Sequence, residues 1–246
     1  MLLSFAFFKN KVKYILNFSI SYDKIGYSKP KRTKKMKTYL FDFDGTLVDS
    51  MPTWSATMKR ILDETNTPYG EDLVKIITPL GAVGTAKYFI ELGSPLTLDE
   101  ILEKMSEYLV REYTENVPAK ESVIETLREL KRRGDSINVL TASPHLTLDP
   151  CLKRLGLFNL FDFVWSCDDF GTGKSNPDIY RQAAERLGKR VDEVIFIDDN
   201  LGADKTAKSA GMTVYGIYDD TSKDYVEEMK AATDKYIYKF EELLNL

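Results

Sequence analysis

The apolar positions after residue 36 follow two alternating spacings, and each change of spacing predicts a new element. Short apolar runs bounded by polar turns fit strands that are buried on both faces. Between these runs, apolar residues recur every three or four positions, as in helices that bury one side. The predicted strands are 39–43, 137–140, 163–166, 194–197 and 213–217. Strands that alternate with helices predict an α/β fold with a doubly wound parallel sheet.

Residues 51–116 interrupt this alternation, because they show helical spacing and loops but no convincing strand. Trp54 and Met58 are interpreted as core residues of this block, and a glycine-containing loop is expected at 79–84. A capping-box pattern that begins at Thr97 predicts the start of a further helix. We therefore predict a core of residues 37–50 and 117–246, and a small helical subdomain of residues 51–116 inserted into it.

Composition and charge narrow the class of protein. With 43% hydrophobic and 29% charged residues, the 246-residue chain resembles ordinary globular proteins. Its apolar runs are far shorter than the about 20 residues that a membrane span needs. Residues 1–36 hold nine basic residues and one acid, a net charge of +8, which leaves −12 for residues 37–246. A body this acidic binds nucleic acid poorly, so we expect neither a nucleic-acid nor a membrane partner.

The basic segment 1–36 is expected to be disordered or not part of the native protein. Met36 directly precedes the first predicted strand and would make a natural first residue. A basic amphipathic segment at a membrane surface is the alternative. Only two cysteines are present, which indicates reduced thiols and a cytoplasmic protein, and the single histidine, His145, excludes a His-based zinc site. The oligomeric state is not indicated.

Polar residues gather where the predicted strands end. Asp42 and Asp44 lie one residue apart after the first strand, so an extended backbone can turn both carboxylates the same way. Two like charges this close repel each other unless a cation or a proton lies between them. Further polar residues at strand ends are Thr141, Ser143, Asp198 and Asp199. Ligands of parallel sheets bind at these ends, so the pattern favours a magnesium-dependent reaction with a nucleophile and a proton donor.

Four short motifs together resemble those of the haloacid dehalogenase (HAD) superfamily over about residues 37–246. They are Asp42-Phe43-Asp44-Gly45-Thr46, Thr141-Ala142-Ser143, Lys174 and Asp198-Asp199. The layout is similar to the first cap class, which includes phosphoglycolate phosphatase and β-phosphoglucomutase. The resemblance implies a Rossmann-like core in which the helical subdomain is a cap domain that closes over the site.

The resemblance also implies a role for each motif residue. Asp42 attacks phosphorus and forms an aspartyl-phosphate, and Asp44 protonates the leaving oxygen and later activates water. The hydroxyl and backbone N–H groups of residues 141–143 hold the phosphoryl oxygens, and Lys174 places a positive charge beside them.

The implied metal site takes its ligands from two of the motifs. The Asp42 side chain and the Asp198-Asp199 pair bind Mg²⁺, with Asp199 favoured over Asp198 as the direct ligand, and Asp44 contributes its backbone carbonyl. Hard oxygen ligands of this kind suit Mg²⁺. The implied partner is a small phosphorylated metabolite.

We therefore predict a magnesium-dependent phosphatase that works through an aspartyl-phosphate. A phosphomutase of the β-phosphoglucomutase type would share all four motifs, and a catalytically silent binding module is a third possibility. Dehalogenases of the superfamily lack the second aspartate of the first motif, so Asp44 argues against dehalogenation.

The segment around Lys174 departs from the pattern of many relatives, which have proline directly after the lysine. Here Asn176 can cap a helix whose first residue is Pro177, and this arrangement should still point Lys174 into the site. Gly173-Lys174-Ser175 is also the end of a P-loop pattern, but Asp168 stands where that pattern needs glycine. Asp168-Asp169 are interpreted as polar loop residues. His145 is expected near the mouth of the site or simply on the surface.

Overall fold

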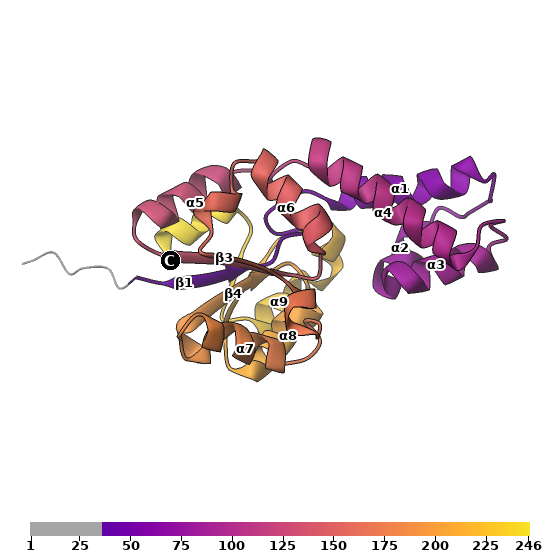
Figure 1. Ribbon diagram of the computed structural model, residues 1–246. Coiled ribbons are helices and arrows are strands. Elements are labelled where there is room, and N and C mark those ends of the chain that lie inside the picture. The colour runs from indigo at the N-terminus through magenta and orange to yellow at the C-terminus, as the bar shows by residue number, and fades with distance from the viewer. Residues whose placement is uncertain (1–35) are drawn as a thin grey trace, which may run out of the picture. The chain divides into compact units, whose positions relative to one another are not determined.

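The predicted strands form one parallel sheet in the computed structural model, which describes residues 36–246 (Figure 1). The strands are β1 Thr38–Phe41, β2 Ser136–Thr141, β3 Phe163–Ser166, β4 Val194–Asp198, β5 Thr213–Ile217 and β6 Lys235–Ile237. Their order is β3-β2-β1-β4-β5-β6, and every neighbouring pair is parallel. The prediction of a doubly wound α/β fold is therefore confirmed.

Helices cover both faces of this sheet. They are α5 Val123–Arg132, α6 His145–Arg154, α7 Asp178–Arg186, α8 Leu201–Ala210 and α9 Val226–Ala232. In β1, Tyr39 and Phe41 belong to the buried cluster that packs against α5 and α6, whereas Leu40 belongs to the cluster that packs against α7 and α8. Because successive strand residues point to opposite faces, a strand that is apolar throughout must be covered twice.

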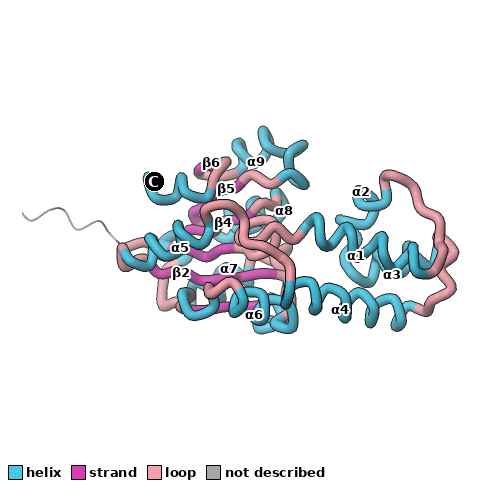
Figure 2. The backbone as a smooth tube through the Cα atoms, turned by 90° about the horizontal axis from the view of Figure 1, so that it is seen from above, coloured by secondary structure: helices cyan, strands magenta, loops and turns pink. Residues whose placement is uncertain are grey.

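Residues 51–115 fold as a separate group of helices. They are α1 Met51–Glu64, α2 Leu73–Ile77, α3 Gly81–Glu91 and α4 Leu98–Glu115. These helices share a buried cluster of their own that includes Met58, Ile61 and Phe89, with Trp54 packed against it. Figure 2 shows the group lying beyond the ends of the strands. The separate cluster supports the predicted subdomain 51–116, whose status as an independent domain stays a prediction.

Some boundaries differ from the predictions. Residues 79–84 are not a loop, because a 3₁₀ helix ends at Leu80 and α3 begins at Gly81. Gly81 has a φ of +65°, which lets the chain turn sharply enough that no longer loop is needed. The short helix α2 and the edge strand β6 were not predicted, since each spans too few residues to show a period. The capping box at Thr97 is confirmed, with the Glu100 N–H donating to Thr97 Oγ1.

Short 3₁₀ helices join several of these elements. They are Thr78–Leu80, Phe158–Leu160, Cys167–Phe170, Val191–Glu193, Asp220–Tyr225 and Phe240–Asn245. The predicted basic segment covers residues 1–36, of which residues 1–35 lie outside the described residues. Between residues 36 and 246, no helix combines the length and the apolar character that crossing a membrane requires.

Candidate active site

The carboxyl ends of β1, β2 and β4 bring the predicted motif residues together. Asp42 directly follows β1, and its backbone N–H donates to the Ile197 carbonyl of β4 at 2.9 Å. Thr141 is the last residue of β2 and Asp198 is the last residue of β4. Asp42, Thr141 and Asp198 are all buried. Because β1 lies between the other two strands, their side chains converge on one point at this edge of the sheet.

Lys174 provides the positive charge at this point. Its Nζ lies 2.7 Å from Asp42 Oδ1 and 2.8 Å from Asp198 Oδ2. The Tyr180 hydroxyl of α7 donates to the Lys174 carbonyl at 3.0 Å and so fixes the backbone. The helix begins at Asp178, one residue later than predicted, and Asn176 Oδ1 accepts the Asp178 N–H at 3.0 Å. The local turn therefore directs Lys174 between the two carboxylates.

A third carboxylate, that of Asp199, lies close to the two that contact Lys174. One oxygen from each of Asp42, Asp198 and Asp199 lies within 4.8 Å of the others, and all three residues are buried. Burial, followed by the charge of Asp198, raises the pKa of Asp42 to about 7. Burial and the charges of Asp198 and Asp42 also raise the pKa of Asp199 well above its ordinary value. Such a set of hard oxygen atoms with excess negative charge fits a divalent cation such as Mg²⁺.

The loop after Asp42 positions Asp199. The Thr46 hydroxyl donates to Asp199 Oδ1 at 2.8 Å, and Thr46 is fully buried. Gly45 has a φ of +76°, and a Cβ atom at this position would lie 2.5 Å from Asp199 Oδ2. Only glycine therefore allows the loop to approach the Asp199 carboxylate this closely.

Asp44 lies beside the triad, and both of its carboxylate oxygens accept hydrogen bonds. Tyr113, in the last turns of α4, donates its hydroxyl to Asp44 Oδ1 at 2.5 Å. The Ser143 hydroxyl donates to Asp44 Oδ2, while Thr141 Oγ1 accepts the Ser143 N–H at 3.0 Å. Ala142 is exposed between them. All the residues of the four predicted motifs thus lie at one end of the sheet.

A model of the haloacid dehalogenase-like hydrolase family matches residues 36–211. The chain belongs to this family of hydrolases. The phosphorylated carbohydrates phosphatase of Thermotoga maritima is 28% identical over 184 residues, which cover 74% of this chain and 85% of that protein. Pyrophosphatase PpaX of Bacillus velezensis is 31% identical over 187 residues, which cover 75% and 84% of the two chains.

Solved structures agree with the curated relatives. A candidate β-phosphoglucomutase from Thermotoga maritima is 27% identical and has a TM-score of 0.72, with 85% of this chain and 97% of that chain covered. The predicted family is therefore confirmed, and so is the prediction of an enzyme of the phosphatase type.

The HAD-like site also depends on residues that the sequence did not reveal. Lys120 donates from Nζ to the Gly45 carbonyl at 2.6 Å, to the Tyr218 carbonyl at 3.1 Å and to Asp219 Oδ2 at 2.8 Å. This lysine holds the loop that carries Asp44 against the segment after β5. Lys120 and Asp219 are far apart in the chain, and neither stands in a recognisable motif.

Asp204 of α8 is a second unexpected residue. It is completely buried, and neither carboxylate oxygen has a hydrogen-bond partner in the described structure. Burial, followed by the charges of Asp198 and Asp199, raises its pKa to about 9. Burial and these neighbouring charges therefore favour the protonated form of this carboxyl. Its signal in the sequence is an acid on a helix face otherwise made of Ala203, Ala207 and Ala210.

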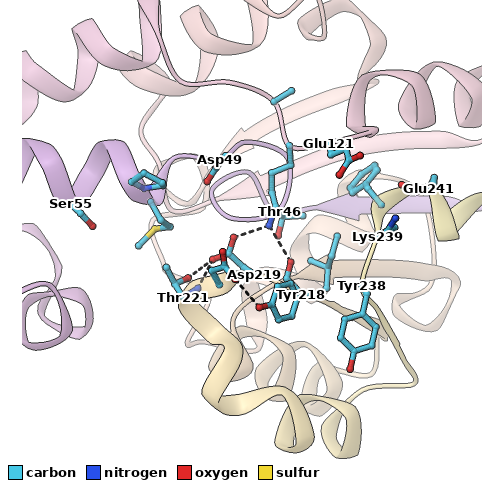
Figure 3. A pocket seen from close by; sticks show the side chains of 17 residues that line it. Thr46, Asp49, Ser55, Glu121, Tyr218, Asp219, Thr221, Tyr238, Lys239 and Glu241 are labelled. Carbon is cyan, nitrogen blue, oxygen red and sulfur yellow. Dashed lines mark hydrogen bonds and ion pairs between the residues drawn. The ribbon is translucent and has the colours of Figure 1, made fainter.

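A pocket of about 510 Å³ lies beside the site (Figure 3). Thr46, Asp49 and Asp219 are among its lining residues, and the lining includes neither Asp42 nor Lys174. Its walls come from the start of α1, from the segment after α4 and from the segments that follow β5 and β6. The pocket therefore adjoins the loop that holds Asp199 and does not contain the converging carboxylates.

His145 and Asp169 lie outside the triad. The His145 side chain, 41% exposed, lies in the first turn of α6 between Asp149 and Asp169, at 2.8 and 2.9 Å. Asp169 also accepts the Ser166 N–H at 2.9 Å, which caps the 3₁₀ helix after β3. Asp168 and Asp169 therefore lie in a one-turn 3₁₀ helix and not in a loop as predicted, and neither belongs to the acidic triad. Cys151 and Cys167 are buried and unpaired.

A comparison of Gly45→Ala with Gly156→Ala should distinguish the effect of a clash with Asp199 from the effect of backbone strain alone. Gly156→Ala is the matched control, because Gly156 has a φ of +70° but a Cβ atom at that position would meet nothing within 4 Å. Each alanine should lower the free energy of unfolding by about 1–3 kcal/mol through its positive φ. Only Gly45→Ala should lower phosphatase turnover, by about 100-fold, since it displaces the Asp199 carboxylate. Equal turnover in the two variants would show that the contact is unimportant.

Proposed function

We propose that this HAD-like hydrolase is a magnesium-dependent phosphatase that hydrolyses a small phosphorylated metabolite through an aspartyl-phosphate on Asp42. One observation carries the proposal: the buried Asp42 carboxylate lies 2.7 Å from Lys174 Nζ and within a triad of acids. Phosphoryl transfer depends mostly on positioning and on neutralising charge, and this site concentrates both around one nucleophile.

In the first step, an Asp42 carboxylate oxygen attacks phosphorus and the bond from phosphorus to the ester oxygen breaks. Asp44 gives its proton to the departing oxygen, so the alcohol leaves neutral. Lys174 faces Asp42 and stabilises the negative charge on the phosphoryl group. The Thr141 hydroxyl at the end of β2 and a backbone N–H of the segment 141–143, which precedes the N-terminus of α6, contribute hydrogen bonds to the phosphoryl oxygens, while the Ser143 hydroxyl donates to Asp44.

In the second step, Asp44 takes a proton from water as that water attacks the phosphorus of the aspartyl-phosphate. The bond from phosphorus to Asp42 breaks, which releases inorganic phosphate and regenerates the free Asp42 carboxylate. The side chains of Asp42 and Asp199 and the backbone carbonyl of Asp44 would hold Mg²⁺, with Asp198 kept in place by Lys174. When bound, the metal would supply positive charge for the phosphoryl oxygens.

We also infer that α1–α4 act as the cap domain. The helix α1 begins nine residues after Asp42, and Tyr113 near the other end of the block contacts Asp44. Both connections to the sheet therefore start beside the reacting groups, so a movement of the block opens or closes the site. Closure would exclude bulk water from the aspartyl-phosphate.

Two relatives support a small phosphorylated substrate, since one is named for phosphorylated carbohydrates and another for pyrophosphate. We expect a small phosphate ester, and the cap residues that would choose among esters have no general motif. Two buried, unpaired cysteines suit a reducing compartment, so we place the enzyme in the cytoplasm.

A phosphomutase is the second candidate, because one similar structure is a candidate β-phosphoglucomutase. Both activities need the same nucleophile, and they differ in whether water or a second hydroxyl removes the phosphoryl group. Rapid isomerisation of a sugar phosphate with little release of phosphate would favour the mutase.

Removal of the metal tests the proposed function. Turnover of p-nitrophenyl phosphate and of a panel of sugar phosphates should require Mg²⁺, fall to background with excess EDTA and return when Mg²⁺ is added in excess. The triad has too much uncompensated negative charge to hold a phosphoryl group without a cation. Turnover that is unchanged by EDTA would contradict the metal assignment, and no turnover of any ester would favour a silent binding module.

A further inference from the structure

We propose that Tyr113 is a positioning residue that orients the Asp44 carboxylate for proton transfer to the leaving oxygen. The inference rests on the proposed phosphatase function and adds to it a residue from the helical block. Tyr113 belongs to no motif, and it lies 69 residues from Asp44 in the sequence.

The Asp44 carboxylate is held from two sides by different parts of the fold. Tyr113 of α4 donates to Oδ1 at 2.5 Å, and Ser143 after β2 donates to Oδ2. Asp44 itself is only partly buried, and each of its two carboxylate oxygens accepts one of these hydrogen bonds. One donor would leave the carboxylate free to pivot about that contact, whereas two donors on opposite oxygens fix its plane.

The Tyr113 hydroxyl is itself rigidly placed. The residue is 5% exposed, and its ring packs against Phe43 with the ring centroids 6.0 Å apart. Arg154 of α6 donates to the carbonyls of Tyr113 and Val117, which ties the end of α4 to the sheet side of the molecule. A donor that is fixed at both its ring and its backbone can hold a carboxylate in one orientation.

This contact should matter most for esters whose leaving group needs a proton. An alkoxide is a poor leaving group and depends on a proton from Asp44, whereas p-nitrophenolate leaves readily without one. Because kcat/KM reports the first irreversible step, it follows the formation of the aspartyl-phosphate. Misorientation of Asp44 should therefore slow alkyl esters more than the aryl ester, and a general loss of structure should slow both alike.

The test is Tyr113→Phe, which removes one hydroxyl and keeps the ring. For an alkyl phosphate that the wild type hydrolyses, kcat/KM should fall about 10-fold, since general acid catalysis is worth 10²–10⁴-fold and Ser143 keeps part of the orientation. For p-nitrophenyl phosphate the fall should be less than about twofold. Equal changes for the two esters, or no change for either, would overturn the proposal.

Tyr108→Phe is the matched control. Tyr108 lies on the same helix and donates its hydroxyl to a carboxylate at 2.6 Å, but that carboxylate is Glu64 within the helical block. This control therefore also removes one tyrosine hydroxyl from α4, but from a residue that does not contact Asp44. Both esters should be hydrolysed as by the wild type, and a fall limited to the alkyl ester in this control would contradict the assignment to Tyr113.

A double variant separates positioning from damage to the fold. If Tyr113 acts through Asp44, Tyr113→Phe should lower kcat/KM no further in an Asp44→Asn background. A fall by the same factor in both backgrounds would mean that Tyr113 is merely structural, even if the single variant is less stable. A wild-type protein without phosphatase activity would contradict the proposed function itself. An active wild type whose kcat/KM is unchanged by Tyr113→Phe would contradict only the role of Tyr113.

Discussion

Asp42→Asn is expected to lower phosphatase kcat by at least about 1,000-fold, because it removes the nucleophile that forms the covalent intermediate. The fold should survive the change. Asparagine keeps the shape of the side chain, and its amide carries no charge into a crowded triad in which burial raises the pKa of Asp42 to about 7. Turnover of p-nitrophenyl phosphate and the midpoint of thermal unfolding would be measured on the same preparation.

Asp178→Asn is a suitable control for this substitution. It makes the same chemical change on a side chain that is 62% exposed at the start of α7. We expect turnover within about twofold of the wild type, as for surface substitutions away from a site. Retained turnover in Asp42→Asn, with the control also active, would remove Asp42 from the mechanism.

Lys174→Met should affect both turnover and stability. Without the ammonium group, the buried carboxylates of Asp42 and Asp198 face each other with no compensating charge. Breaking a buried ion pair from one side lowers the free energy of unfolding by about 3–5 kcal/mol, and the 14% exposure of Lys174 places the expected loss near the lower value. Turnover should fall at least about 100-fold, because the phosphoryl group loses its fixed positive neighbour.

Denaturant unfolding of the metal-free protein measures this loss. Lys205→Met is the control, since Lys205 is 57% exposed and lies 3.7 Å from Glu228 in a surface ion pair. Such pairs contribute about 0–1 kcal/mol, so the control should unfold almost as the wild type does. A Lys174→Met variant as stable as this control would show that the lysine does not hold the carboxylates together.

The fold and the motif residues could be predicted because their signals are local. Each strand is a short apolar run, and Asp42, Thr141 and Asp198 follow or end three of those runs. Parallel strands place such positions at one edge of the sheet, so the convergence follows from topology. The edge strand β6 gave too short an apolar run to recognise, and the turn at Gly81 depends on a backbone angle that the residue pattern does not specify.

The groups that hold the motifs could not be predicted, because they act over long distances in the chain. Tyr113 reaches Asp44 from α4, and Lys120 joins the Gly45 carbonyl to Asp219 across separate loops. In the sequence, neither Tyr113 nor Lys120 stands in a motif that would mark it as part of the site. Only the packing of α4 and of the loop after β5 against the sheet brings them to the site.

The central claim is that phosphorus is transferred to Asp42. Asp44→Asn should slow the hydrolysis of the aspartyl-phosphate, since the group that activates water is lost, while p-nitrophenolate can still leave. Rapid acid quench of this variant with p-nitrophenyl phosphate and Mg²⁺, followed by peptide mass spectrometry, should find one phosphoryl group on Asp42 and a matching burst of p-nitrophenolate. A burst with the phosphoryl group on another residue, or steady turnover with no covalent adduct, would contradict the account.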